Sequence, residues 1–514
     1  MNLDQITQPF SEKFPGDLSG NPRQRQTPKV LFSTTQIMGF ENADLIIFNK
    51  KLAEEIGLGK IEQEEDTDFL NAASLPANIK TYATAYAGHQ FGNWAGQLGD
   101  GRAIFAGEIQ NKNGKKTELQ WKGAGATPYS RHADGRAVLR SSVREYLMSE
   151  AMHHLGIPTT RALSLSFTGE EVMRDMMYDG NADYEKGAVM MRTAESFLRF
   201  GHFELISSQQ EIGTLRKLTD FTIQNYFPEI NVESPNKYAL LFQTISERTA
   251  DLMVEWYRVG FVHGVMNTDN MSVLGLTIDY GPFSFLDEYA LNFTPNTTDL
   301  PGRRYAFGNQ GKIAQWNLWQ LANALFPLIN DEKILEKILN DFTEMFWTKH
   351  DAMMAKKFGF DRVLEGDGRF FTDAQQIMED FKIDYTLFFN KLENADENSD
   401  LKNLFAEVFY EHVSEENFLK FENFIKMYLE RLGKNTISRA ESLALMQKSN
   451  PKFILRNYIL FECINEVNEG KKDLLNKILT ALENPYKELY PEFSKKRPSM
   501  YNGQSGCSTL SCSS

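Results

Sequence analysis

The chain has 514 residues, of which 42% are hydrophobic and 12% aromatic, so it can bury a large core and global disorder is excluded. Its 55 Lys and Arg against 69 Asp and Glu give a net charge of −14, which disfavours nucleic acid and anionic membranes as partners. No apolar run is long enough to span a membrane, residues 1–14 resemble neither a secretory signal nor a transit peptide, and the three cysteines exclude a disulfide framework. We therefore expect a globular, cytoplasmic protein with no nucleic-acid and no membrane partner.

The composition changes once along the chain. Residues 82–311 are rich in glycine and contain short strand-like segments. From about Lys312 onward, Leu and Phe recur at spacings of three and four, which is typical of helices. The sequence therefore predicts an α+β front half joined to a helical back half.

Three elements are predicted within the front half. Residues 102–109 and 117–122 are expected as strands, joined by an Asn-Lys-Asn-Gly segment that suits a hairpin turn. The second strand ends at Lys122. Residues 138–155 are expected as a helix because apolar residues recur on one face, and Glu145 lies beside that apolar stripe.

A glycine-rich turn and a charged pair are the first candidates for a nucleotide site. Gly99, Gly101 and Arg102 lie directly before the first strand, where glycines let backbone N–H groups approach an anion. A strand lysine, Lys122, followed by a helix glutamate, Glu145, is the pairing with which protein kinases position nucleotide phosphates. A tight turn with a surface arginine, and an ordinary salt bridge, are the alternatives.

The segment 263–270 is similar to a kinase catalytic loop without its base. Kinase loops have the catalytic Asp two residues after His and a metal-binding Asn five residues further on. Here these positions hold Val265 and Asn270, and Asp279-Tyr-Gly stands where kinases have Asp-Phe-Gly. Side-chain oxygens of Asn and Asp suit Mg²⁺ or Mn²⁺, and Asp269 is the new carboxylate near the vacated position. A loop rich in Asx turns is the alternative.

Two arginines complete the candidate site. Arg192 and Arg199 are seven residues apart, so in a helix they would share a face and could clamp phosphoryl oxygens. Solvent-facing arginines are the alternative. Taken together, the order of glycine loop, strand lysine, helix glutamate, Asn and Asp-x-Gly predicts a kinase-like nucleotide site.

Several long strings carry a family resemblance. They are YAGHQFGNWAGQLGDGRA, LQWKGAGATPYSRHADGRAVLRSSVREYLMSEAMHHLGIPT, FLRFGHFE, FVHGVMNTDNMSVLGLTIDYGPFSFLD and GNQGKIAQWNLWQLANAL. With these strings the chain resembles the selenoprotein-O (SelO/YdiU) family, densely over about residues 82–325 and more weakly beyond. The resemblance implies a protein-kinase-like bilobal α+β fold that lacks the usual catalytic Asp and has a large helical C-terminal part. It also implies transfer of AMP from an ATP bound in reversed orientation, with release of pyrophosphate.

The resemblance implies a role for each candidate residue. Asp269 would be the proton acceptor, Asn270 and Asp279 would hold Mg²⁺ or Mn²⁺, and Glu145 would hold Lys122. The implied nucleotide contacts are Gly99, Gly101, Arg102, Lys122, Asp134, Gly135, Arg192, Arg199 and Asp279. The implied partners are ATP and protein substrates with Ser, Thr or Tyr hydroxyls.

The resemblance also divides the chain into four parts. We expect an N-terminal extension over residues 1–80 that packs on the core, and an N-lobe over residues 81–190 with the glycine loop, the strand lysine and the helix glutamate. A mostly helical C-lobe with the catalytic and metal-binding loop is expected over residues 191–500. Residues 501–514 are expected to form a flexible tail that contains cysteine.

One cysteine is a candidate redox residue. Cys512 stands where eukaryotic members of the family have selenocysteine, and because no cysteine lies near Asp279, only Cys463 or Cys507 could pair with it. Three other functions remain open. They are a phosphotransferase that uses Asp269 as a displaced base, an inactive ATP-binding scaffold, and a thiol-redox protein that acts through Cys512.

Overall fold

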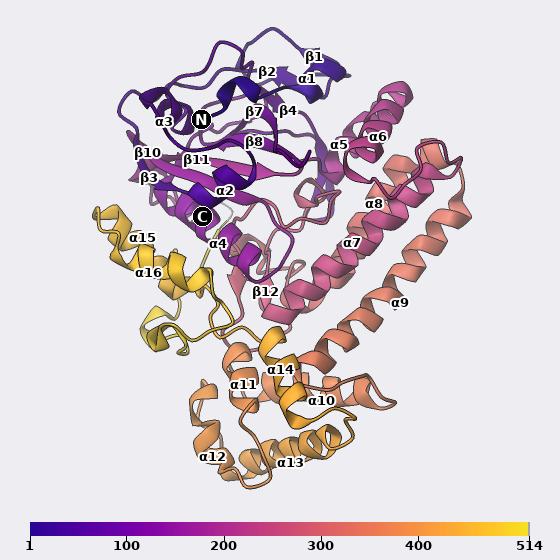
Figure 1. Ribbon diagram of the computed structural model, residues 1–514, viewed down its shortest axis with the longest axis vertical. Helices are drawn as coiled ribbons and strands as arrows, with labels where there is room; N and C mark the ends of the chain where they lie inside the picture. Colours follow the sequence, from indigo (N-terminus) through magenta and orange to yellow (C-terminus); the bar gives the residue numbers. More distant parts are fainter. Residues whose placement is uncertain (512–514) are drawn as a thin grey trace.

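The structure is a computed structural model, and it describes residues 1–511. A strand-rich part built from the beginning of the chain joins a helical part that reaches the far end of the molecule (Figure 1). The strands are β1 (Gly16–Asp17), β2 (Phe32–Thr34), β3 (Asp44–Phe48), β4 (Tyr82–Thr84), β5 (Ala87–Gln90), β6 (Asn93–Gln97), β7 (Ala103–Gln110), β8 (Lys116–Lys122), β9 (Ala137–Val138), β10 (Arg161–Arg174), β11 (Asp183–Ala194), β12 (Phe261–Val262) and β13 (Ser284–Phe285).

The described strands form one large mixed sheet and two small two-stranded sheets. The large sheet has the order β1-β2-β4-β7-β8-β11-β10-β3, with β9 paired to β11, and β1 and β2 are its parallel pair. Residues 1–80 therefore supply strands to both ends of the sheet. The small sheets are the β5–β6 hairpin and the β12–β13 pair, whose strands flank the loop of residues 263–283.

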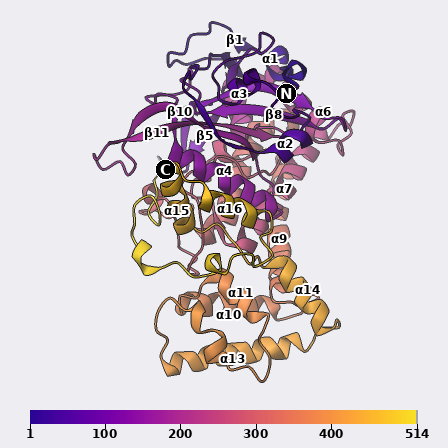
Figure 2. The same cartoon turned by 60° about the vertical axis from the view of Figure 1, so that its left-hand side comes forward.

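The helices account for most of the second half of the chain, as the composition predicts. They are α1 (Pro9–Lys13), α2 (Lys50–Glu55), α3 (Glu64–Leu70), α4 (Leu139–His154), α5 (Phe200–Ser208), α6 (Ile212–Tyr226), α7 (Lys237–Val259), α8 (Gln310–Ile329), α9 (Glu332–Lys357), α10 (Asp367–Asp380), α11 (Tyr385–Leu392), α12 (Leu401–Leu404), α13 (Glu415–Leu432), α14 (Arg439–Ser449), α15 (Asn457–Asn468) and α16 (Asp473–Leu482). Helices α10 to α14 lie farthest from the sheet, whereas α15 and α16 return to pack beside α4 (Figures 1 and 2).

The elements predicted in the front half are confirmed. Strands β7 and β8 pair antiparallel, and the turn between them is closed by a hydrogen bond of 2.9 Å from the Asn111 N–H to the Lys115 carbonyl. Helix α4 runs over the predicted range and is followed by Gly156, whose φ of +82° is the left-handed conformation that glycine tolerates best.

Two apolar cores lie on the two faces of the sheet. The larger begins between the sheet and α4 and continues through the C-terminal helices. The smaller lies between the other face and helices α2 and α3, where the Trp121 indole donates to the Phe69 carbonyl at 2.9 Å. The next residue, Lys122, faces the opposite way, toward α4, so alternation along β8 places a core anchor and a site residue side by side.

The C-terminal segment differs from the flexible tail that the sequence predicted, as far as the structure describes it. Cys507 and Leu510 are fully buried, and the Leu510 carbonyl accepts a hydrogen bond of 2.8 Å from the Thr297 N–H. Apolar side chains in an otherwise small, polar segment explain why it packs on the body. Cys512 lies outside the described residues.

Candidate active site

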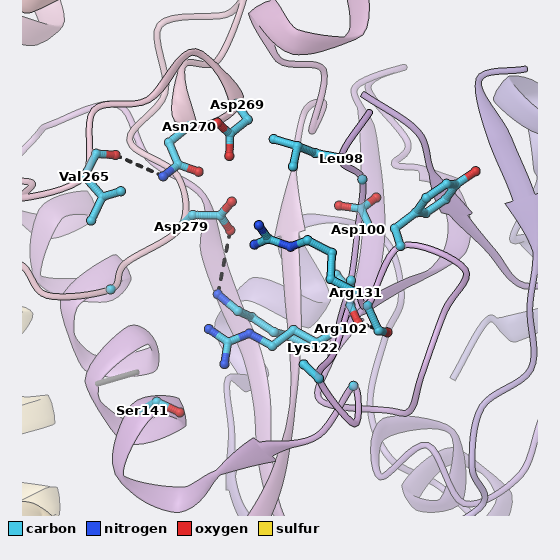
Figure 3. A pocket seen from close by; sticks show the side chains of 18 of the residues that line it. Leu98, Asp100, Arg102, Lys122, Arg131, Ser141, Val265, Asp269, Asn270 and Asp279 are labelled. Carbon is cyan, nitrogen blue, oxygen red and sulfur yellow. Dashed lines mark hydrogen bonds and ion pairs between the residues drawn. The ribbon is translucent and has the colours of Figure 1, made fainter. Parts of the chain in front are cut away.

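A pocket of about 610 Å³ lies where the sheet, α4 and the loop that follows β12 meet (Figure 3). Its walls bring together residues from distant parts of the chain. The predicted residues that line it are Gly99, Gly101, Arg102, Lys122, Asp134, Gly135, Arg192, Arg199, Asp269, Asn270 and Asp279. Glu145 lies behind Lys122 and is not part of the lining.

The pocket floor is a buried cluster of opposite charges centred on Asp279. Arg192 Nη1 donates to Asp279 Oδ1 at 2.5 Å, and Arg199 Nη1 donates to Asp279 Oδ2. Lys122 Nζ donates to Glu145 and lies 3.7 Å from Asp279 Oδ1. Arg192 also reaches Glu145, at 3.1 Å. Three cations therefore share two carboxylates, and the side chains of both arginines are only 2% exposed.

The charged groups of this cluster shift one another's pKa values. Burial alone would raise the pKa of Asp279, but Arg199, Arg192 and Lys122 hold it well below its usual value. Burial lowers the pKa of Lys122, and Glu145 opposes that shift. Asp279 therefore stays ionised and neutralises the cations as long as no other anion occupies the pocket.

Arg192 and Arg199 reach the site by a route that differs from the predicted one. They do not lie on one helix, because Arg192 belongs to β11 and Arg199 is the residue before α5. The apolar run of β11 continues the sheet, and the chain turns only after Ala194. The two guanidinium groups nevertheless converge, one from the sheet and one from a helix start.

Asp269 is a buried carboxylate with spare hydrogen-bonding capacity. It lies in a short 3₁₀ turn (Thr268–Asn270), where Oδ2 accepts a hydrogen bond of 3.3 Å from Gln90 and Oδ1 is buried without a partner. Burial raises the pKa of Asp269 to about 6, against the opposing charge of Arg199. A carboxylate with this pKa can accept a proton near neutral pH.

Strand β5 presses its backbone against this carboxylate. A Cβ atom placed on Gly88 would lie 2.7 Å from Asp269 Oδ1, so only glycine permits the observed approach. Neither Gly88 nor Gln90 is recognisable from the sequence as a site residue, because their contact with Asp269 joins segments about 180 residues apart.

The side chain of Asn270 is oriented so that its amide oxygen can serve as a ligand of a metal ion. Its side-chain nitrogen donates to the Val265 carbonyl at 2.9 Å, which turns the amide oxygen toward Asp279 (Figure 3). The residues present fit a hard cation such as Mg²⁺ or Mn²⁺, because this amide oxygen and the Asp279 carboxylate face the same space. Within residues 1–511 no cluster of three or more His, Cys, Asp and Glu side chains could hold a metal, so a bound ion would need further oxygens from a ligand.

The wall opposite Asn270 contains one residue that the sequence pattern could have indicated. Asp100, inside the glycine segment, accepts a hydrogen bond of 3.0 Å from the Thr84 N–H and lies 3.7 Å from Arg199 Nη2.

At the mouth of the pocket, Asp134 pairs with Arg174 at 2.7 Å. Gly135 is needed for close packing, since a Cβ atom there would lie 2.2 Å from the Gly125 carbonyl oxygen.

The described cysteines give no support to thiol chemistry. Cys463 and Cys507 are buried free thiols, and burial raises the pKa of each to about 12, which suppresses the reactive thiolate.

Among the helices of residues 1–511, none combines the length and apolar character needed to cross a membrane.

A pocket with this charge pattern is suited to an enzyme that handles a polyphosphate, because it pairs a cationic floor with oxygen ligands and a carboxylate of raised pKa. Comparison with known proteins agrees with this class. The family model of protein adenylyltransferase SelO matches residues 17–483. The chain is 49% identical to the protein nucleotidyltransferase YdiU of Cytophaga hutchinsonii over 100% of this chain and 99% of the relative. The YdiU protein of Flavobacterium johnsoniae is 44% identical over 99% of each chain, and that of an Azoarcus species 43% over 98% of each.

The chain therefore belongs to the SelO family, and its class is that of an enzyme, a protein nucleotidyltransferase.

Proposed function

We propose that this enzyme transfers AMP from ATP to Ser, Thr or Tyr hydroxyls of proteins and releases pyrophosphate. The observation that carries the proposal is the position of Asp269. It is a buried carboxylate with one unpartnered oxygen, directly before Asn270 and on the same side of the pocket as Asp279 (Figure 3), whereas Val265 occupies the sequence position of a kinase base. The Lys122–Glu145 pair and the loop that carries Asn270 support a kinase-like arrangement of the two parts.

The cationic floor supplies the binding site for the phosphates. In the free enzyme Arg192, Arg199 and Lys122 are paired with Asp279 and Glu145, which leaves one excess positive charge. We propose that the β- and γ-phosphates of a reversed nucleotide take over these contacts, since bidentate Arg–phosphate pairs are strong. The exchange frees Asp279 to act with Asn270 as a ligand of Mg²⁺ or Mn²⁺, which would neutralise the charge of the phosphates.

Asp269 then acts as the general base. The substrate hydroxyl oxygen forms a bond to the α-phosphorus while its proton passes to the Asp269 carboxylate. The bond between that phosphorus and the bridging oxygen breaks, and pyrophosphate leaves with the electron pair. Gly99, Gly101 and Arg102 hold the triphosphate from the glycine segment, and Asp134 and Gly135 contact the nucleotide at the mouth. Correct positioning accounts for most of such catalysis, and the base adds roughly 10²–10⁴-fold.

The mass of a modified acceptor protein tests the proposal. Incubation with ATP and Mg²⁺ or Mn²⁺ should add the mass of an AMP group to the acceptor, and the Asp269→Asn variant should add it far more slowly. Addition of a phosphate mass would instead identify a phosphotransferase. If the enzyme binds ATP but no acceptor gains mass, the scaffold alternative is supported.

A further inference from the structure

We propose that the outer face of the β5–β6 hairpin, together with the start of α8, docks an acidic segment of the protein substrate. We name this the hairpin surface. Its residues are His89, Trp94, Arg303, Arg304, Lys312, Trp316 and Trp319. The inference rests on the proposed function, because it assigns a substrate class to the same active site.

The hairpin connects this surface directly to the base. Gly88 and Gln90 face Asp269, so alternation along β5 directs His89 to the other side of the strand. The His89 ring lies 5.0 Å from the ring of Trp94 and 5.4 Å from that of Trp316. Strand β5 therefore contacts the proposed base, Asp269, on its inner side. On its outer side it carries His89, which with Trp94 and Trp316 forms a row of aromatic rings that we call the aromatic row.

Helix α8 extends the aromatic row. Lys312, Trp316 and Trp319 are at positions i, i+4 and i+7, which share one face of a helix. Trp319 is 53% exposed and Trp94 is 46% exposed. Exposed tryptophans grouped next to a catalytic pocket are typical of a contact surface for another protein.

The charges of the surface indicate which partner it takes. Within residues 1–511, Arg303, Arg304 and Lys312 have no carboxylate within ion-pair distance, although the chain as a whole carries a charge of −14. The Arg304 guanidinium stacks 4.5 Å from the Trp316 ring centre, and its Nε and Nη2 are buried, so Arg303 and Lys312 are the exposed cations that a partner can reach. The nearest acidic contact of the aromatic row is Glu204, which is buried and bonded to His89 at 2.7 Å.

An acidic partner segment complements this arrangement. Carboxylates would neutralise the exposed Arg303 and Lys312, while an apolar or aromatic neighbour in the segment would cover Trp94 and Trp319. The hydroxyl to be modified would lie on the same segment, beyond the edge of the hairpin and within reach of Asp269. A local basic surface on an acidic enzyme also steers acidic substrates to the active site and repels basic ones.

Two synthetic acceptors test the docking proposal. They are a random copolymer of glutamate and tyrosine and a random copolymer of lysine and tyrosine, each incubated with ATP labelled at the α-phosphate. We expect the acidic copolymer to be labelled with a kcat/KM at least about tenfold higher. The variant Arg303→Glu/Lys312→Glu should lose about tenfold for the acidic copolymer through a higher KM, with an unchanged KM for ATP.

A matched control separates docking from general charge effects. Lys426 is an exposed lysine on α13, at the far end of the molecule (Figure 1). Lys426→Glu should leave the preference unchanged. Equal labelling of both copolymers, no effect of the double variant, or no labelling of either copolymer while the enzyme labels itself would each overturn the docking proposal. Absence of α-label from every acceptor, the enzyme included, would instead contradict the proposed function.

Discussion

Removal of the Asp279 carboxylate should destabilise the protein and at the same time strengthen its binding of metal-free ATP. Asp279 accepts from Arg192 and Arg199 and lies 3.7 Å from Lys122 Nζ. Asp279→Ala therefore leaves Lys122 and Arg192 to share Glu145, and leaves Arg199 with Asp100 at 3.7 Å as its remaining carboxylate. Loss of one partner from a buried ion pair costs about 3–5 kcal/mol. We expect a loss of that order in the free energy of unfolding.

The same change removes the internal competitor of the triphosphate. In the proposed binding mode ATP must displace Asp279 from the arginines of the wild-type enzyme, whereas in the variant Arg192 keeps only Glu145 and Arg199 only Asp100 as carboxylate partners. With EDTA present, Asp279→Ala should therefore bind ATP about tenfold more tightly, a gain of about 1.4 kcal/mol, although it transfers no nucleotide.

Denaturant unfolding and titration calorimetry measure the two effects. Asp251→Ala is the matched control, because Asp251 is 59% exposed and pairs with Lys349 at the surface, where such a pair contributes about 0–1 kcal/mol. If Asp279→Ala is as stable as the control and binds metal-free ATP no better than the wild type, Asp279 neither stabilises the buried cations nor competes with the triphosphate.

Three further outcomes follow from the same contacts. Because burial raises the pKa of Asp269 to about 6, kcat/KM of the wild type should fall about tenfold per pH unit below pH 6. Asp269→Asn should be slower by roughly 10²–10⁴-fold and should lack this pH dependence. A pH–rate profile of the variant that keeps the slope would exclude Asp269 as the base. Gly88→Ala should lower kcat with little change in ATP affinity, because the new Cβ would lie 2.7 Å from Asp269 Oδ1; single-turnover rates equal to the wild type would contradict the close approach. Glu118 of β8 is buried and accepts a hydrogen bond of 2.7 Å from the Phe197 N–H. Burial raises the pKa of Glu118 from 4.5 to about 8, so its protonated form stabilises the fold fully below about pH 4.5 and this contribution is lost as the pH rises toward 8. Between those pH values the unfolding free energy of the wild type should fall relative to that of Glu118→Gln by on the order of a few kcal/mol, since one pKa unit corresponds to about 1.4 kcal/mol, and parallel stability curves would contradict this.

Local signals made part of the structure predictable from the sequence. The β7–β8 turn and the end of α4 at Gly156 depend on residues adjacent in the chain, so turn chemistry and helix periodicity identified them. The contact between Lys122 and Glu145 was predicted from a known pattern of strand lysine and helix glutamate, and the structure confirms it.

Contacts between distant segments were not predictable in the same way. Arg192 and Arg199 were correctly placed in the pocket but for a wrong reason, because a strand end and a helix start bring them together rather than one helix face. The approach of Gly88 to Asp269 depends on how a hairpin packs on a loop far along the chain. No local propensity encodes such packing, and the buried C-terminal segment around Leu510 was missed for the same reason.

The fate of the two ends of the triphosphate distinguishes transfer of AMP from transfer of phosphate. The enzyme, an acceptor protein and a divalent cation are incubated with ATP labelled at the α-phosphate or at the γ-phosphate. We expect label on the acceptor from α-labelled ATP alone, with pyrophosphate as the co-product, and strongly reduced labelling by Asp269→Asn. Label on the acceptor from γ-labelled ATP, with ADP as the co-product, would contradict AMP transfer and identify a phosphotransferase.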